Sequence, residues 1–195
     1  GFRNVVGIFV GTGIGGGLVL DGRLYIGGTG NAGEIGHMII QTDGPLCGCG
    51  QYGCVEALAS RTAIAKDAAA LAGSGAAPAM LEAGGTDLKD IKSGALAAAI
   101  KEGDTAVRRV VERAAAFVGI AMANCVNLLA PEVIVLGGGL LEKLGDLFVK
   151  EAERSMREHT MESIAAGTKV VLAALGDDAV PVGAAVLARE AHEGA

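Results

Sequence analysis

The stretch that decides the fold of this chain is residues 33–56, GEIGHMIIQTDGPLCGCGQYGCVE. It contains three of the four cysteines and one of the three histidines. Cys47, Cys49 and Cys54 place three thiolates within eight residues, and His37 lies ten residues before the first of them. Three sulfurs and one imidazole are a ligand set of closed tetrahedral zinc sites. The stretch therefore predicts a structural zinc site.

A disulfide is the alternative interpretation of the same cysteines. It would pair two of the three thiols in this stretch and leave the third without a partner. The sequence shows no signal peptide, so an oxidising compartment is not indicated. The spacing favours zinc over the disulfide.

Two carboxylates accompany the predicted metal ligands. Zinc takes only one ring nitrogen of His37, so the other nitrogen must find its own hydrogen-bond partner. In one interpretation that partner is a polyol hydroxyl, and Glu34 and Glu56 accept hydrogen bonds from neighbouring hydroxyls. In the other, Glu34 only orients His37 and Glu56 only begins a helix. The residues alone leave both interpretations open.

A second glycine-rich motif, GTGIGGG at residues 11–17, lies between two predicted strands. A dinucleotide fingerprint needs a helix directly after the glycines, and a P-loop needs a Gly-Lys pair that is absent here. A glycine-rich turn between strands can still bind phosphate through its exposed amides, with the Thr12 hydroxyl as a further donor. The alternative is a plain hairpin. The expected strands around it are residues 3–10, 18–20 and 23–26, the last two joined by an Asp21–Gly22 turn.

The rest of the chain alternates helices and strands. The pattern predicts a strand at 38–40, helices at 55–72 with Ser60 capping a second segment, 76–83, 94–101, 104–129 and 140–159, strands at 132–136 and 168–173, and a last helix from 181. Cys125 falls on the apolar face of the long helix, so we expect it in the core. Gly137 and Gly138 lie between a strand and a helix, which suits either an anion or nucleotide site or a tight packing turn.

Composition narrows the function classes. The length of 195 residues allows one domain, and the net charge of −6 argues against non-specific nucleic-acid binding. The most apolar run, residues 114–130, is short for a membrane span and contains Asn124 and Asn127. We therefore expect a cytoplasmic protein that binds neither membrane nor, through this domain, nucleic acid.

The motifs together resemble the signature of the ROK family of bacterial sugar kinases and sugar-responsive repressors. The resemblance rests on GEIGH at 33–37, DGP at 43–45, the cysteine motif at 47–56, GTGIGGG at 11–17 and VLGGG at 135–139. It implies an α/β fold, the large-domain half of the ribonuclease H-like, actin-like ATPase superfamily, with a mixed sheet, helices and a zinc loop inserted after the third strand. Its expected parts are the phosphate loop 11–17, the sugar and zinc loop 31–56, a helical part 57–129 and adenosine-side strand–helix units 132–191.

The resemblance also implies the ligands. Structural zinc is expected on His37, Cys47, Cys49 and Cys54. Hexose contacts are expected from Glu34, His37 and Glu56, with Asn31 added by position only. MgATP is expected at Gly11, Thr12, Gly13, Gly137 and Gly138.

The expected activity is that of a glucokinase-type sugar kinase, and a repressor's sugar-sensing domain is the alternative. Family members carry an N-terminal domain with a DxGxTK-like motif and, at its end, the catalytic Asp. Neither is found in this sequence. We therefore expect a C-terminal domain that holds no catalytic residue and is inactive alone. We also expect a homo-oligomer.

Overall fold

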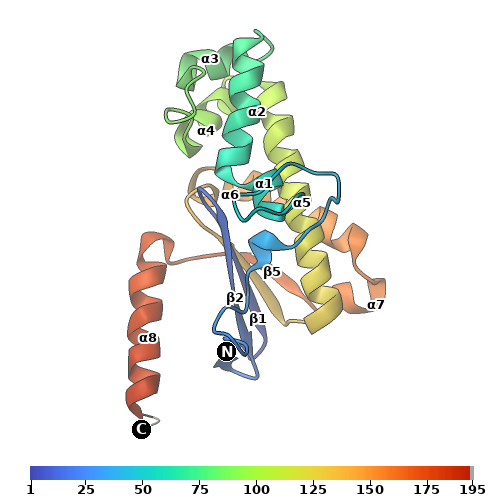
Figure 1. The fold of residues 1–195 in the computed structure, drawn as a ribbon, viewed down its shortest axis with the longest axis vertical. Helices are drawn as coiled ribbons and strands as arrows, with labels where there is room; N and C mark the ends of the chain where they lie inside the picture. Colours follow the sequence, from blue (N-terminus) through green and yellow to red (C-terminus); the bar gives the residue numbers. More distant parts are fainter. Residues whose placement is uncertain (194–195) are drawn as a thin grey trace.

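The chain folds around one mixed β-sheet, with most of its helices gathered on one side (Figure 1). The computed structural model describes residues 1–193. The strand order is β3-β2-β1-β4-β5. Strands β1 to β3 form an antiparallel meander, whereas β4 runs parallel to β1 and β5 parallel to β4. The strands are β1 (Val5–Val10), β2 (Ile14–Leu20), β3 (Arg23–Leu24), β4 (Val133–Gly137) and β5 (Lys169–Leu172).

The central strand β1 brings two loops to one edge of the sheet. Its apolar alternation buries Val6, Ile8 and Val10 completely. In the parallel pair with β4, Phe9 lies opposite Gly137. Because parallel strands end at the same edge, the loop after β1 and the loop after β4 lie side by side.

The two longest helices form the main packing layer. Helix α5 (Thr105–Leu129) begins where the Asp104 carboxylate accepts a hydrogen bond from the Val107 amide at 3.2 Å. Helix α6 (Leu141–His159) crosses it closely at Gly119, where an added Cβ would lie 2.5 Å from the Ala152 carbonyl oxygen. Beside this contact the Ser155 hydroxyl donates to the Ala116 carbonyl at 2.8 Å. The small residue and the hydroxyl together fix the crossing.

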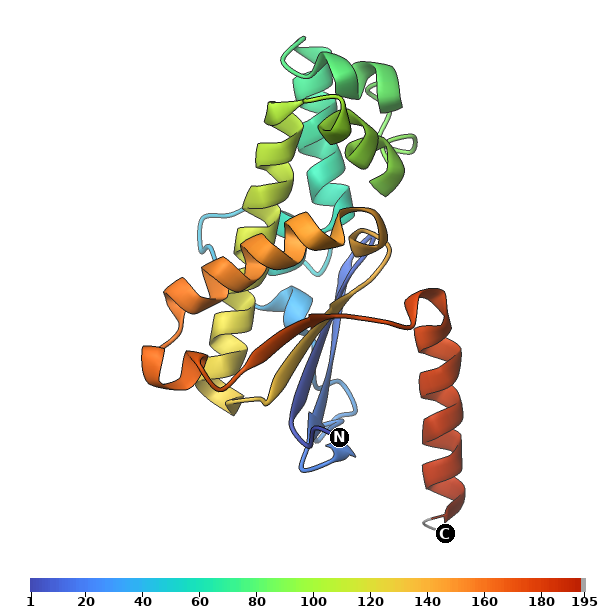
Figure 2. The ribbon, with the colours of Figure 1, turned by 180° about the vertical axis from the view of Figure 1, so that it is seen from behind.

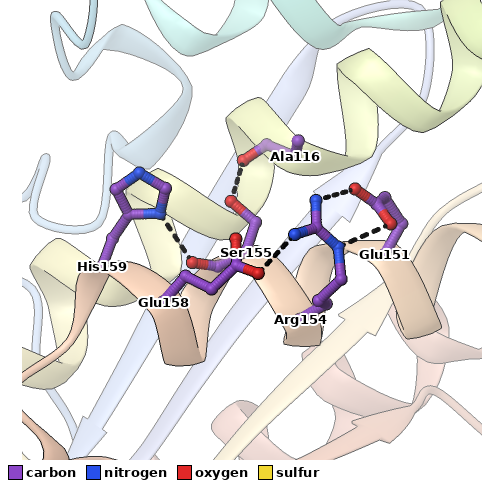
Figure 3. A network of polar contacts seen from close by, with 6 residues as sticks. All are labelled: Ala116, Glu151, Arg154, Ser155, Glu158 and His159. Carbon is purple, nitrogen blue, oxygen red and sulfur yellow. Dashed lines mark hydrogen bonds and ion pairs between the residues drawn. The ribbon is translucent and has the colours of Figure 1, made fainter.

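Helix α6 is strongly amphipathic. Its inner face buries Phe148 and Met156 completely. On its outer face the Arg154 guanidinium binds carboxylates one turn away on either side, Glu151 and Glu158 (Figure 3). Such exposed pairs each contribute only about 0.3–0.5 kcal/mol. The apolar face therefore does most to hold α6 against α5.

Helices α2, α3 and α4 form a cap beyond one end of the sheet, α7 packs against α5 and α6, and α8 is a separate C-terminal element (Figure 1). Ser60 ends α1, and its hydroxyl accepts a hydrogen bond from the Ala63 amide at 3.2 Å as the N-cap of α2. Seen from both sides, α8 stands apart from the other helices (Figures 1 and 2). Its Val180 is 80% exposed. These elements are η1 (Ile35–His37), α1 (Val55–Ala59), α2 (Arg61–Gly73), α3 (Pro78–Gly84), α4 (Ser93–Lys101), α7 (Glu162–Ala165), η2 (Gly176–Asp178) and α8 (Ala179–Glu193).

Among residues 1–193, only α5 is long and apolar enough to cross a membrane. Of its most apolar window, 61% is buried inside the molecule. This burial is what a core helix shows. Cys125, on its apolar face, is 5% exposed and confirms the expected core position.

The mixed α/β sheet, the hairpin and the Ser60 break are confirmed, and three strand predictions need correction. The second strand begins at Ile14 rather than residue 18, because residues 14–17 pair with β1, so only residues 11–13 of the predicted phosphate loop 11–17 form the turn. The third strand ends at Leu24 rather than residue 26, because the Ile26 carbonyl accepts from the Ala32 amide and closes a turn. Residues 38–40 form no strand. Ile39 makes only an isolated bridge with Cys54, since a 3₁₀ turn precedes it and the cysteine loop follows. The last helix begins at Ala179, two residues earlier than predicted.

Candidate functional site

The predicted metal ligands converge. The ligand atoms of His37, Cys47, Cys49 and Cys54 all lie within 4.8 Å of one another. The His37 Nδ1 atom is 3.7 Å from the Cys47 Sγ atom, and the Cys49 and Cys54 Sγ atoms are also 3.7 Å apart. Bond lengths of zinc to sulfur and nitrogen predict tetrahedral edges of about 3.8 Å for two sulfurs and about 3.6 Å for sulfur and nitrogen. The four side chains therefore fit a zinc ion.

The thiols differ in their surroundings. Burial raises the pKa of the Cys54 thiol to about 12, whereas a backbone hydrogen bond from Gln51 lowers the pKa of the exposed Cys49 thiol. A buried neutral thiol binds zinc only by losing its proton, so metal binding at this cluster releases protons. The free ring nitrogen of His37, Nε2, lies 3.8 Å from a Glu34 carboxylate oxygen. The ring thus turns one nitrogen to the thiols and the other to Glu34.

Glu56 connects this cluster to the glycine-rich loop after β1. It lies in the first turn of α1, directly after the last cysteine. Its Oε2 atom accepts a hydrogen bond from the Ile14 amide at 2.8 Å, and the Cys47 thiol lies 3.8 Å from its Oε1 atom. The loop after β1 and the cysteine loop are therefore held together by one carboxylate, across 42 residues of sequence.

Glycines allow the backbone around the start of β2 to lie close to residues 33–36 and to Glu56. A Cβ atom at Gly36 would clash with the Ile14 carbonyl oxygen, and one at Gly16 would clash with the Gly33 carbonyl oxygen. A Cβ at Gly13 would clash with the Glu56 carboxylate. We call this contact between the start of β2 and residues 33–36 the glycine seam. It places the GEIGH motif directly on β2, whose first four residues are the second half of the GTGIGGG motif.

The tip of that loop is open. Thr12 is exposed, and the backbone amides of Thr12 and Gly13 donate to no acceptor in the described part of the chain. Exposed successive amides of this kind suit an anion. Thr12, Cys47 and Glu56 also line one groove of about 740 Å³ between the cysteine loop and the helices α2 and α5.

A cavity of about 430 Å³ lies at the neighbouring strand ends. Its lining includes Phe9, Gly137 and Gly138, with further walls from the start of α6 and of α8. A Cβ at Gly137 would lie 2.9 Å from the Phe9 ring, so the glycine lets the aromatic ring close against the β4 end. The GTGIGGG loop follows β1, and the glycines that line the cavity follow β4. Because β1 and β4 are parallel neighbours, the cavity adjoins the loop.

The predicted residues thus fall into three adjoining groups: the thiol–imidazole cluster with the two glutamates, the GTGIGGG loop, and the glycines after β4. Asn31 is exposed, and its side-chain amide donates to the Thr29 carbonyl at 3.3 Å within its own loop. Sequence reasoning missed Phe9 and Arg61. The Arg61 guanidinium donates to the Thr12 hydroxyl at 2.5 Å. The one local signal was that Arg61 follows the predicted cap Ser60, at a helix N-terminus where acidic residues are usual.

Comparison with known proteins supports the sequence resemblance. A glucokinase from Halalkalibacterium halodurans is 35% identical over 203 residues, covering 97% of this chain and 57% of that protein. An N-acetylmannosamine kinase from Vibrio cholerae is 55% identical over 67 residues, which is 34% of this chain and 23% of the kinase. A xylose repressor from Caldicellulosiruptor bescii is 29% identical over 92% of this chain and 44% of its own length.

The fold is that of a solved sugar kinase. The structure of a Streptomyces griseus ROK family glucokinase in complex with glucose and AMPPNP superposes with a TM-score of 0.87 and 32% identity. The match covers 97% of this chain and 62% of that one. The ROK family model matches residues 1–191, so the chain belongs to the ROK family. It spans about three fifths of the length of these glucokinases.

Proposed function

We propose that the whole protein is a sugar kinase that transfers the γ-phosphate of MgATP to a hexose hydroxyl. The observation that carries this proposal is the junction at Glu56, which joins the candidate sugar site to the open amides of residues 12–13. Phosphoryl transfer needs its two substrates aligned more than it needs covalent chemistry from the protein. A fixed link between the two loops is what such alignment requires.

In this proposal the sugar is bound by Glu34, His37 and Glu56. The two carboxylates accept hydrogen bonds from sugar hydroxyls, and the His37 Nε2 atom meets a third. The half-buried position of His37 beside Glu34 supports this role. Asn31 remains a sugar contact by position only.

The nucleotide occupies the neighbouring edge of the sheet. The cavity beside Phe9, Gly137 and Gly138 takes the adenosine, and the amides of Thr12 and Gly13 with the Thr12 hydroxyl hold the phosphates. The Gly11 amide donates to the Gly13 carbonyl at 2.8 Å, so Gly11 shapes this phosphate-binding turn. The order of these parts along the sheet edge supports the assignment, because the phosphate loop lies between the cavity and Glu56.

Zinc is structural in this proposal. It would be held by His37 Nδ1 and the three thiolates, fixing the histidine ring so that Nε2 faces the sugar. The chemistry that zinc supplies is limited to holding the loop closed, since all four positions are taken by protein.

We assign no general base to these 195 residues. Glu34 and Glu56 are committed to sugar hydroxyls, and Asp43 lies in the exposed cysteine loop. The base must lie within hydrogen-bond reach of the attacking hydroxyl. We propose that it belongs to the part of ROK kinases that this chain does not span, so that residues 1–195 alone do not phosphorylate sugar.

A coupled ADP-release assay on the whole protein tests the kinase function. Glucose is the first substrate to try because the glucokinases match over nearly the whole chain, and N-acetylmannosamine is the second because of the shorter, closer match. Sugar-dependent turnover of roughly 1–100 per second is expected. Sugar binding without turnover would instead favour a sensing domain, as the xylose repressor similarity allows.

Glu34→Ala gives a matched test of the sugar site. The lost hydroxyl contact is expected to raise the sugar KM about 10–100-fold while the ATP KM stays unchanged. Glu112→Ala, in an exposed ion pair on α5, is the control and should leave both constants unchanged. An unchanged sugar KM in Glu34→Ala would remove Glu34 from the site.

A further inference from the structure

Arg61 joins the first turn of α2 to the phosphate loop. Its guanidinium donates to the Thr12 hydroxyl at 2.5 Å, and its backbone amide donates to the Gly11 carbonyl at 2.9 Å. The neighbouring Thr62 hydroxyl donates to the Thr12 carbonyl at 2.7 Å. Three hydrogen bonds thus fix residues 11–12 against α2, and one of them comes from a positive charge.

The charge of Arg61 is not compensated within the described chain. No carboxylate whose side chain the structure describes forms an ion pair with it, whereas four other arginines each bind at least one: Arg108, Arg113, Arg154 and Arg157. A guanidinium carries five N–H donors, and the bond to Thr12 uses one of them. Arg61 therefore brings unused donors and a full positive charge to the loop.

Its neighbours on the loop are also donors without acceptors. The amides of Thr12 and Gly13 donate to no group in the described residues. When the Thr12 oxygen accepts from Arg61, the hydroxyl proton is free to point outward. Two amides, one hydroxyl and one guanidinium at a single exposed turn are complementary to the oxygens of a phosphate.

We propose that Arg61 is a phosphate-binding residue that contacts the terminal phosphate of the nucleotide. This inference rests on the proposed kinase function and adds a residue that neither glycine motif contains. The terminal phosphate is favoured because residues 11–13 lead from the end of β1, where Phe9 lines the nucleotide cavity, to Ile14, whose amide binds Glu56 of the sugar site. The phosphate nearest Glu56 is the one that faces the sugar.

The test measures binding of AMPPNP and of adenosine, each with Mg²⁺, to the whole protein by calorimetry. Arg61→Gln removes the charge, while the backbone bond from residue 61 to the Gly11 carbonyl and the bond from the Thr62 hydroxyl to the Thr12 carbonyl remain to hold the loop. Arg61→Gln is expected to weaken AMPPNP binding about 10–100-fold while adenosine and glucose bind as in the wild type. The salt dependence of AMPPNP binding should also fall in this variant. Arg61→Lys restores the charge and should recover part of the lost AMPPNP affinity.

Arg108→Ala is the matched control, because it removes a surface arginine whose partner is Glu112. It should leave AMPPNP binding unchanged. If Arg61→Gln bound AMPPNP as tightly as Arg108→Ala does, or lost adenosine equally, the inference would be overturned. Wild-type protein that bound neither nucleotide would overturn the proposed function and this inference with it.

Discussion

Replacing Gly138 by Ala is the most demanding test of the strand-end geometry. Gly138 has a φ of +97°, a conformation that residues with a Cβ rarely adopt. An added Cβ would lie 2.5 Å from the Val10 carbonyl oxygen, 2.7 Å from its nitrogen and 2.8 Å from its carbonyl carbon. All three neighbours are backbone atoms of β1, so no side chain can rotate away.

The magnitude follows from two costs. An unfavourable positive φ costs about 1–3 kcal/mol. A carbon normally approaches a carbonyl oxygen to about 3.3 Å, so the β1 end or the β4 end must move by about 0.8 Å. Such overpacking costs about 1–3 kcal/mol. We expect Gly138→Ala to lower the free energy of unfolding by at least about 2 kcal/mol.

Urea unfolding followed by circular dichroism measures this loss. With a slope of about 2 kcal/mol per molar for a chain of this size, the midpoint should fall by about 1 M. The next residue is the control: a Cβ at Gly139 meets nothing within 4 Å, and its φ is not positive. Gly139→Ala should therefore keep the wild-type midpoint or raise it slightly. Equal midpoints for the two variants would refute the close approach of β1 and β4 described here.

Two further predictions concern the metal and acid stability. Protein purified without chelator should contain one zinc per chain, and Cys54→Ser should lower that content; zinc-free wild-type protein would contradict the assignment. Hydrogen bonds from the Asn4 and Arg3 amides hold the pKa of Glu132 below its ordinary value of 4.5. Because the folded pKa is depressed, the stabilisation is present above pH 4.5 and is lost as the pH falls through the folded value. Wild type should thus exceed Glu132→Gln in unfolding free energy at pH 7, and the difference should shrink as the pH falls below 4.5; a constant difference would contradict this.

Local patterns predicted much of the fold because their causes are local. The Asp21–Gly22 turn has positive φ at both residues, as the hairpin type requires, and Ser60 caps α2 as its side chain allows. The convergence of the four candidate metal ligands could be predicted for the same reason, since they lie within 18 residues and chelation depends on spacing.

The parts that escaped prediction depend on distant partners. Arg61 meets Thr12 across 49 residues, and no local pattern indicates which loop a helix N-terminus will meet. Phe9 looked like an ordinary strand residue, but it is 39% exposed because it lies on the face of β1 opposite to the buried Ile8 and Val10, beside Gly137. Residues 38–40 have the composition of a strand, yet the only partner they meet is the short segment around Cys54. Tertiary context decides such cases.

The glycine seam has a consequence for how this protein can vary. At Gly16 and Gly36 two backbones touch without intervening side chains, so no substitution there can be absorbed by trimming or repacking a neighbour. Glu34 and His37, in contrast, extend from the same segment into open or half-open space. In the proposed kinase, sugar preference can therefore change at Glu34 while the distance between the two loops stays fixed, so that selectivity can evolve separately from alignment.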